Sequence, residues 1–101
     1  MRYTQEQLIN VARFSKKDIE QIYQCRRPFN RLGFGYQLSF VSLENRFPSQ
    51  YPLEIADEIL SYTSIQLGIS SENIAEYAQR RQTVDAHRER IRAYLGLLNF
   101  G

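Results

Sequence analysis

The chain has 101 residues and is 43% hydrophobic, which is enough for one compact domain with a modest core and too short for two. Its single cysteine, Cys25, excludes an internal disulfide. No apolar run approaches the roughly 20 residues that span a bilayer, and the first ten residues lack the pattern of a secretory signal. We therefore expect a cytoplasmic protein without a membrane segment.

The formal net charge of +2 indicates no partner by itself, but the charges are unevenly distributed. Residues 26–31 contain three arginines and no acid, residues 80–92 contain five arginines and two acids, and residues 47–79 contain no Lys or Arg. Two basic islands around an acidic middle favour localised contacts with a polyanion over a uniformly basic surface.

Apolar residues recur at spacings of three and four along the whole chain, which predicts an all-α fold of about six helices. Thr4 with Gln7, and Ser15 with Asp18, have the spacing of capping boxes, in which two side chains satisfy the free amides of a first turn. These pairs predict short helices over 5–13 and 16–25.

A third helix is predicted from Pro28, at its first position, to about Leu43. Its apolar residues form two stripes on nearly opposite sides, which predicts a central helix. One stripe is Phe29, Leu32, Tyr36, Phe40 and Leu43, and the other is Phe34, Leu38 and Val41. Gly33 and Gly35 weaken a helix, so we expect them to permit close approach of another backbone.

Residues 44–52 contain two prolines and predict a loop, after which Pro52 begins a fourth helix that Gly68 ends. Ser70 is expected to cap a fifth helix over 71–81. Thr83 is expected to cap a sixth helix over 84–95, ended by Gly96.

The segment from Ser64 to Arg80 resembles a helix-turn-helix, with a glycine that ends one helix and a serine that begins a short amphipathic one. The residues expected on the outside of the second helix are Glu72, Asn73, Glu76, Gln79 and Arg80. Two carboxylates there would repel DNA phosphates, so a simple helical hairpin is an equally good interpretation.

Arg26, Arg27 and Arg31 would suit a phosphate backbone, because a guanidinium binds phosphate bidentately and stays charged. The alternative is that they pair with acids such as Glu44, Asp57 or Glu58 across the fold. In the second island, Asp85 with Arg88 and Glu89 with Arg92 have helical pair spacing. We therefore expect Arg88, Arg90 and Arg92 to form a solvated, salt-bridged face.

His87 falls on the apolar side of the sixth helix and is expected to be buried or at an interface. It has no second His or Cys at ligand spacing, so no metal site is predicted. Neither Cys25 nor the acids form a catalytic arrangement. We expect no cofactor and no small-molecule substrate.

Five short motifs appear in order along the chain. They lie at Arg26 to Leu38, Gln66 to Gly68, Tyr77 to Arg80, Thr83 with His87, and Leu95 to Phe100. In this order and spacing they resemble the N-terminal region of the replicative, cointegrate-forming transposases of the Tn-three family. Gly35 departs from the usual alanine of that pattern, and Val84 and Asp85 stand where the family often has basic residues.

The resemblance implies a region that binds double-stranded DNA at the terminal inverted repeats of a transposon, with the metal-dependent acidic triad for strand transfer in a distant part of a longer chain. It predicts that these 101 residues are not an enzyme by themselves. The candidate DNA-binding residues are Arg26, Arg27, Asn30, Arg31, Arg80 and Arg81. The alternative is an interaction module that assembles transposase protomers through the acidic middle.

Overall fold

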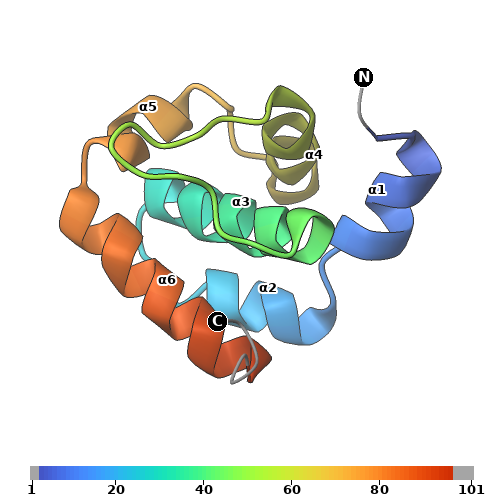
Figure 1. Cartoon of the computed structure of the whole chain (residues 1–101), viewed down its shortest axis with the longest axis horizontal. Helices are drawn as coiled ribbons and strands as arrows, with labels where there is room; N and C mark the ends of the chain where they lie inside the picture. The colour runs from blue at the N-terminus through green and yellow to red at the C-terminus, as the bar shows by residue number, and fades with distance from the viewer. Residues whose placement is uncertain (1–2, 97–101) are drawn as a thin grey trace.

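The computed structural model describes residues 3–96, which form six helices and no strand. The all-α prediction is confirmed. The helices are α1 (Gln5–Ala12), α2 (Lys16–Ile22), α3 (Pro28–Glu44), α4 (Asp57–Leu67), α5 (Asn73–Ala78) and α6 (Arg81–Leu95). Figure 1 shows α3 in the middle, with α1, α2, α4, α5 and α6 arranged around it. No helix within residues 3–96 is both long and apolar enough to cross a membrane.

The first two helices begin at the capping boxes that the sequence predicts. Thr4 Oγ1 accepts from the Gln7 amide at 3.1 Å and the Gln7 side chain accepts from the Thr4 amide at 2.9 Å. Ser15 and Asp18 form the same reciprocal pair at 3.1 and 2.9 Å. The helix predicted over 16–25 ends earlier, at Ile22, because a tighter turn follows it.

Helix α3 is buried on both sides, as its two apolar stripes predict. Residues 32–41 are all buried. One side packs in a cluster with α4, α5 and α6, and its buried residues are Leu32, Tyr36, Phe40, Leu53, Ile59, Leu60, Tyr77 and Val84. The other side packs in a cluster with α2 and α6, and its buried residues are Ile22, Cys25, Phe34, Leu38, Val41, Phe47 and Ile91. Burial of this apolar surface supplies most of the stability of the fold.

The two glycines of α3 admit side chains, not another backbone, so that part of the prediction is wrong. A Cβ at Gly33 would lie 2.3 Å from carbons of the Tyr77 ring. A Cβ at Gly35 would lie 3.1–3.2 Å from the ends of Phe14, Leu67 and Thr63.

The fourth helix does not begin at Pro52, as the sequence suggested, but at Asp57. Leu53 turns into the core, and the Ala56 amide donates to the Tyr36 hydroxyl at 2.8 Å, so residues 53–56 are held against α3 in a non-helical conformation. The loop from Asn45 to Ala56 therefore crosses the front of the molecule in Figure 1.

Two predicted caps are also wrong. Thr83 lies inside α6, because the Val84 amide already donates to the Arg80 carbonyl at 2.9 Å and begins the helix there. Ser70 Oγ accepts from the Glu72 amide at 3.3 Å, in a turn that precedes the shorter α5. The left-handed ends at Gly68 (φ +65°) and Gly96 (φ +62°) are confirmed.

Candidate nucleic-acid interface

Helix α3 begins with Arg27 at its N-cap position and has no side-chain cap and no acid in its first turn. The first amides of a helix lack backbone partners and carry the positive end of the helix dipole. Pro28 removes one of these donors. Arg26 and Arg27 are exposed, and together with Arg31 they form no ion pair within residues 3–96, so the alternative, pairing with acids across the fold, is not formed there.

Helix α6 begins in the same way, with Arg80 at the N-cap position, no side-chain cap and no acid in the first turn. An open hollow of about 370 Å³ lies at this end, and its lining residues are Gln79, Arg80, Arg81, Gln82 and Thr83. Each of the other four helices has an acid in its first turn. Helices α3 and α6 are thus the two whose starts favour an anion.

The fold brings these two helix starts together. The Arg80 guanidinium lies over the Phe29 ring, 4.6 Å from its centroid, and so joins the second arginine island to the first turn of α3. Arg80 is also paired with Glu76 at 2.8 Å, on the exposed side of α5. The starts of α3 and α6 lie at the same side of Figure 1.

Arg31 is held from two directions. Its Nε donates to the Cys25 carbonyl at 2.8 Å, and its guanidinium lies 4.5 Å from the centroid of the exposed Tyr23 ring. These contacts fix the guanidinium while leaving its terminal nitrogens for a ligand. The oxygen of Asn30 is buried and has no hydrogen-bond partner among the described residues, so it is not presented to solvent.

Arg81 lies over the ring of Tyr51, 4.6 Å from its centroid, and the Tyr51 hydroxyl donates to Asp85 Oδ2 at 2.7 Å. No pattern in the sequence indicates this contact, because it joins a loop to a helix 30 residues away and follows no periodicity. The hydrogen bond to Asp85 is the main cause that raises the pKa of Tyr51 above its usual value.

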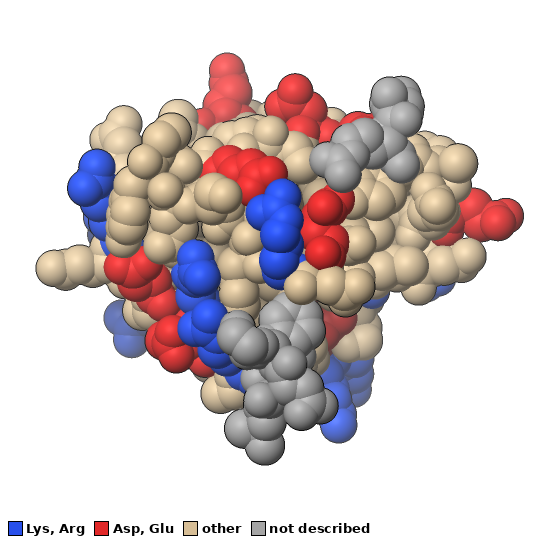
Figure 2. All heavy atoms as spheres, in the orientation of Figure 1, with Lys and Arg blue, Asp and Glu red and all other residues tan. Residues whose placement is uncertain are grey.

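The remaining arginines of the second island lie in different environments. The pair between Arg92 and Glu89 is confirmed at 2.6 Å. Arg90 is not part of a solvated face, because it lies over the Phe34 ring at 4.3 Å and donates to the Gln21 carbonyl at 2.9 Å. Figure 2 shows blue and red side chains side by side over this face, so it is not a continuous basic patch.

The helix-turn-helix interpretation is only partly matched by the geometry. Glu72, Glu76, Gln79 and Arg80 are exposed, as expected, whereas Asn73 is half-buried. Helix α5 has six residues and packs mainly on α3 and α6. It therefore supports the start of α6 rather than forming a two-helix unit with α4.

His87 is buried, as predicted, in a polar network beneath the interface. The Gln37 amide donates to the Tyr77 oxygen at 2.7 Å, which leaves the Tyr77 proton for His87 Nδ1 at 2.8 Å. Burial, with a smaller effect of Arg90, lowers the pKa of His87 to about 4, so the ring is neutral at pH 7. Burial also raises the pKa of the Cys25 thiol, which lies 3.7 Å from His87 Nε2.

This polar network stabilises the fold and lacks the features of a catalytic or metal-binding site. A raised pKa makes the Cys25 thiol a poor nucleophile, and the described residues contain no cluster of three His, Cys, Asp or Glu that could hold a metal ion.

Comparison with known proteins places the sequence of this chain in a family. The model of the family described as "Domain of unknown function (DUF4158)" matches residues 1–101. The chain belongs to this family. It is 34% identical over 86% of its length to the transposase for transposon Tn1546 of Enterococcus faecium, and 30% identical over 97% to the transposase for transposon Tn501 of Pseudomonas aeruginosa. It is also 31% identical over 94% of its length to the transposase for transposon Tn3926 of Escherichia coli.

These relatives confirm the resemblance to the N-terminal region of Tn-three-family transposases and support a role in transposition. The chain spans only about a tenth of their length, since it covers 9–10% of each. No solved structure matches the chain.

Proposed function

We propose that this chain is a DNA-binding module of a transposase and contributes to recognition of the terminal inverted repeats of its transposon. The observation that carries the proposal is the meeting of two acid-free helix starts, those of α3 and α6, through the Arg80–Phe29 contact. Amides at a helix start and guanidinium groups both bind phosphate oxygens. Such contacts position a protein on a duplex, and base contacts then supply sequence preference.

We propose as phosphate contacts the arginines of the two helix starts, namely Arg26, Arg27, Arg31, Arg80 and Arg81. Asn30 is half-buried and its oxygen is enclosed, so we propose it as a further DNA contact through its amide nitrogen alone. The proposal places the module with its DNA in the cytoplasm and assigns strand transfer to the rest of a longer transposase.

A second candidate function is assembly of transposase protomers. A groove of about 370 Å³ lies between α1 and α4, and its lining includes Leu8, Asp57, Glu58 and Ile65. The Ile65 side chain is 75% exposed. An apolar groove next to carboxylates suits an apolar segment that also carries Lys or Arg, and this favours the interaction module if DNA binding fails.

The deciding experiment is titration of a labelled duplex of the terminal repeat from the encoding element, and of a scrambled duplex of equal composition, at two salt concentrations. Salt-sensitive binding with a preference for the repeat supports the proposal. Equal, salt-sensitive binding to both supports DNA binding through the backbone and overturns end recognition. Absence of binding overturns the proposal and favours assembly.

Paired variants locate the contact. R26A/R27A should weaken binding to both duplexes similarly and lower the salt slope by about 0.9 for each lost phosphate contact. The control, K16A/K17A, removes two positive charges at the start of α2, which Figure 1 shows at the opposite end of α3. If the two double variants lose the same affinity, net charge and not this interface is responsible.

A further inference from the structure

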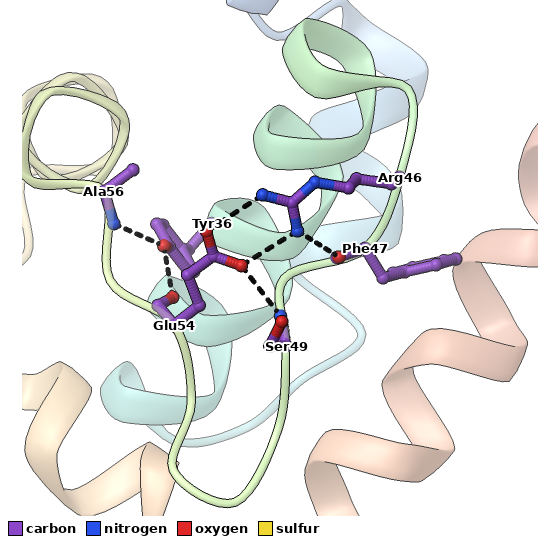
Figure 3. Close-up of polar contacts among 6 residues, drawn as sticks. All are labelled: Tyr36, Arg46, Phe47, Ser49, Glu54 and Ala56. Carbon is purple, nitrogen blue, oxygen red and sulfur yellow. Dashed lines mark hydrogen bonds and ion pairs between the residues drawn. The ribbon is translucent and has the colours of Figure 1, made fainter.

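The loop from Asn45 to Ala56 has no regular secondary structure, but hydrogen bonds to Glu54 hold its base in place. We call these hydrogen bonds, which come from Tyr36, Arg46 and Ser49, the brace. Arg46 holds Glu54 with two parallel hydrogen bonds, from Nη1 to Oε1 at 2.8 Å and from Nη2 to Oε2 at 2.9 Å. The same carboxylate accepts from the Ser49 amide at 3.0 Å. The Tyr36 hydroxyl donates to the Glu54 carbonyl at 2.6 Å, which ties the loop to α3 (Figure 3).

The brace presents one exposed aromatic residue at the tip of the loop. Pro48 and Leu53 are buried on either side of the tip, whereas the Tyr51 side chain is 49% exposed. The backbone of Tyr51 has φ +61°, a left-handed conformation that residues other than glycine rarely adopt. Strained backbone of this kind persists where the surrounding structure fixes it and is concentrated at functional sites.

Tyr51 acts on the start of α6 with both parts of its side chain. Its ring lies under the Arg81 guanidinium, and its hydroxyl donates a hydrogen bond to the carboxylate of Asp85. Arg81 and Asp85 are four residues apart on α6, a spacing at which such side chains can pair. Within residues 3–96, however, the Arg81 guanidinium makes no hydrogen bond or ion pair. Its nitrogens therefore remain available for a ligand.

We propose that Tyr51 is a positioning residue for DNA binding: the braced loop holds its ring beneath Arg81 and its hydroxyl on Asp85, so that Arg81 is presented to a DNA phosphate beside the first turn of α6. This inference rests on the proposed DNA-binding function. A guanidinium stacked on an aromatic ring has lost part of its rotational freedom before the phosphate arrives, and less entropy is lost on binding.

A double-mutant cycle tests the inference with a scrambled duplex as the probe, because a phosphate contact does not depend on sequence. R81A should lower affinity about tenfold at low salt, near the lower end of what a lost charge-assisted hydrogen bond costs. Y51A should lower the affinity by most of the same factor, and it should reduce the salt slope by most of the same amount. The double variant should bind no more weakly than R81A alone, because Tyr51 acts through Arg81.

Two further variants separate positioning from stability. Tyr51→Gly removes the ring but relieves the positive φ, so it should be more stable than Y51A and bind DNA equally weakly. The matched control is Tyr23→Ala, which removes the 52% exposed ring under Arg31. The loss of DNA affinity in Tyr23→Ala should add to the loss in R81A.

The outcomes are distinguishable. If R81A weakens binding while Y51A and Tyr51→Gly bind as wild type, or if the effects of Y51A and R81A add, the positioning role is overturned and DNA binding stands. If the unaltered chain does not bind either duplex at low salt, the proposed function fails and the inference fails with it.

Discussion

The ring of Tyr77 lies directly on the backbone of α3 at Gly33, where a Cβ atom would come within 2.3 Å of three ring carbons. Tyr77 is fully buried, and its hydroxyl is engaged by both Gln37 and His87. The ring therefore cannot move aside without breaking this polar network. The contact seats α5 on α3 and, through α5, sets the position of Arg80.

Gly33→Ala should destabilise the fold by about 2 kcal/mol, because overpacking costs more than the roughly 1 kcal/mol that alanine gains over glycine in a helix. Gly35→Ala is the matched control. Its Cβ would meet the ends of side chains at 3.1–3.2 Å, which can adjust by a few tenths of an ångström. Urea denaturation of both variants checks this, and equal stabilities of Gly33→Ala and Gly35→Ala would contradict it.

The buried His87 makes stability depend on pH above the range in which most carboxylates titrate. Its pKa is about 4 in the folded chain and about 6.5 in the unfolded chain, so protonation favours unfolding. The contribution of the neutral His87 ring to the free energy of unfolding is fully present above pH 6.5. It is lost as the pH falls toward 4, by up to about 3 kcal/mol.

His87→Asn, whose side-chain oxygen can accept from Tyr77, should be less stable at pH 7 through lost packing on Phe34. It should also show a smaller loss of unfolding free energy between pH 7 and 5. A variant that loses as much stability over this range as the wild type would rule out His87 as the cause.

The Glu54 carboxylate, which forms the centre of the brace, titrates at a lower pH than His87. The hydrogen bonds from Arg46 and the Ser49 amide lower the pKa of Glu54 to about 2, against a usual value near 4.5. The carboxylate therefore stabilises the fold above about pH 4.5, and this contribution is lost as the pH falls toward 2. Glu54→Gln should be less stable than wild type at pH 6, and the difference should shrink between pH 4.5 and 2.5. A difference that is constant with pH would contradict the assignment.

The sequence predicted those parts of the fold that depend on residues close in the chain. The capping boxes of α1 and α2, the two apolar stripes of α3 and the left-handed ends at Gly68 and Gly96 all follow from local spacing, and all are confirmed. Pro52 misled the prediction because a local preference for a first helical position was outweighed by tertiary contacts of Tyr36 and Arg46 with the loop.

The candidate site could be predicted only as separate pieces. Its arginines were evident as two charge islands, but nothing in the spacing indicated that Arg80 would lie on Phe29, 51 positions earlier, or that Tyr51 would lie beneath Arg81. Contacts between segments far apart in the chain depend on how α3, α5 and α6 pack together, and a single sequence carries no periodic signal for them.

Glu76 offers a gain-of-function test of the interface. It pairs with Arg80 at 2.8 Å, and both side chains are about half exposed. Glu76→Gln removes a carboxylate that would repel phosphates and releases Arg80 from the pair, while the Phe29 ring still holds the guanidinium. We expect affinity for both the terminal-repeat and the scrambled duplex to rise about threefold at low salt and to converge with wild type at high salt.

The stability of Glu76→Gln should change little, because an exposed pair of this spacing contributes only about 0.3–0.5 kcal/mol. The control is Glu89→Gln, which removes the same charge and also releases an arginine, Arg92, but in the second half of α6, two turns beyond its start. A local effect requires Glu76→Gln to exceed Glu89→Gln clearly. Equal gains would show that only net charge matters, and no gain in Glu76→Gln would place Arg80 outside the DNA contact.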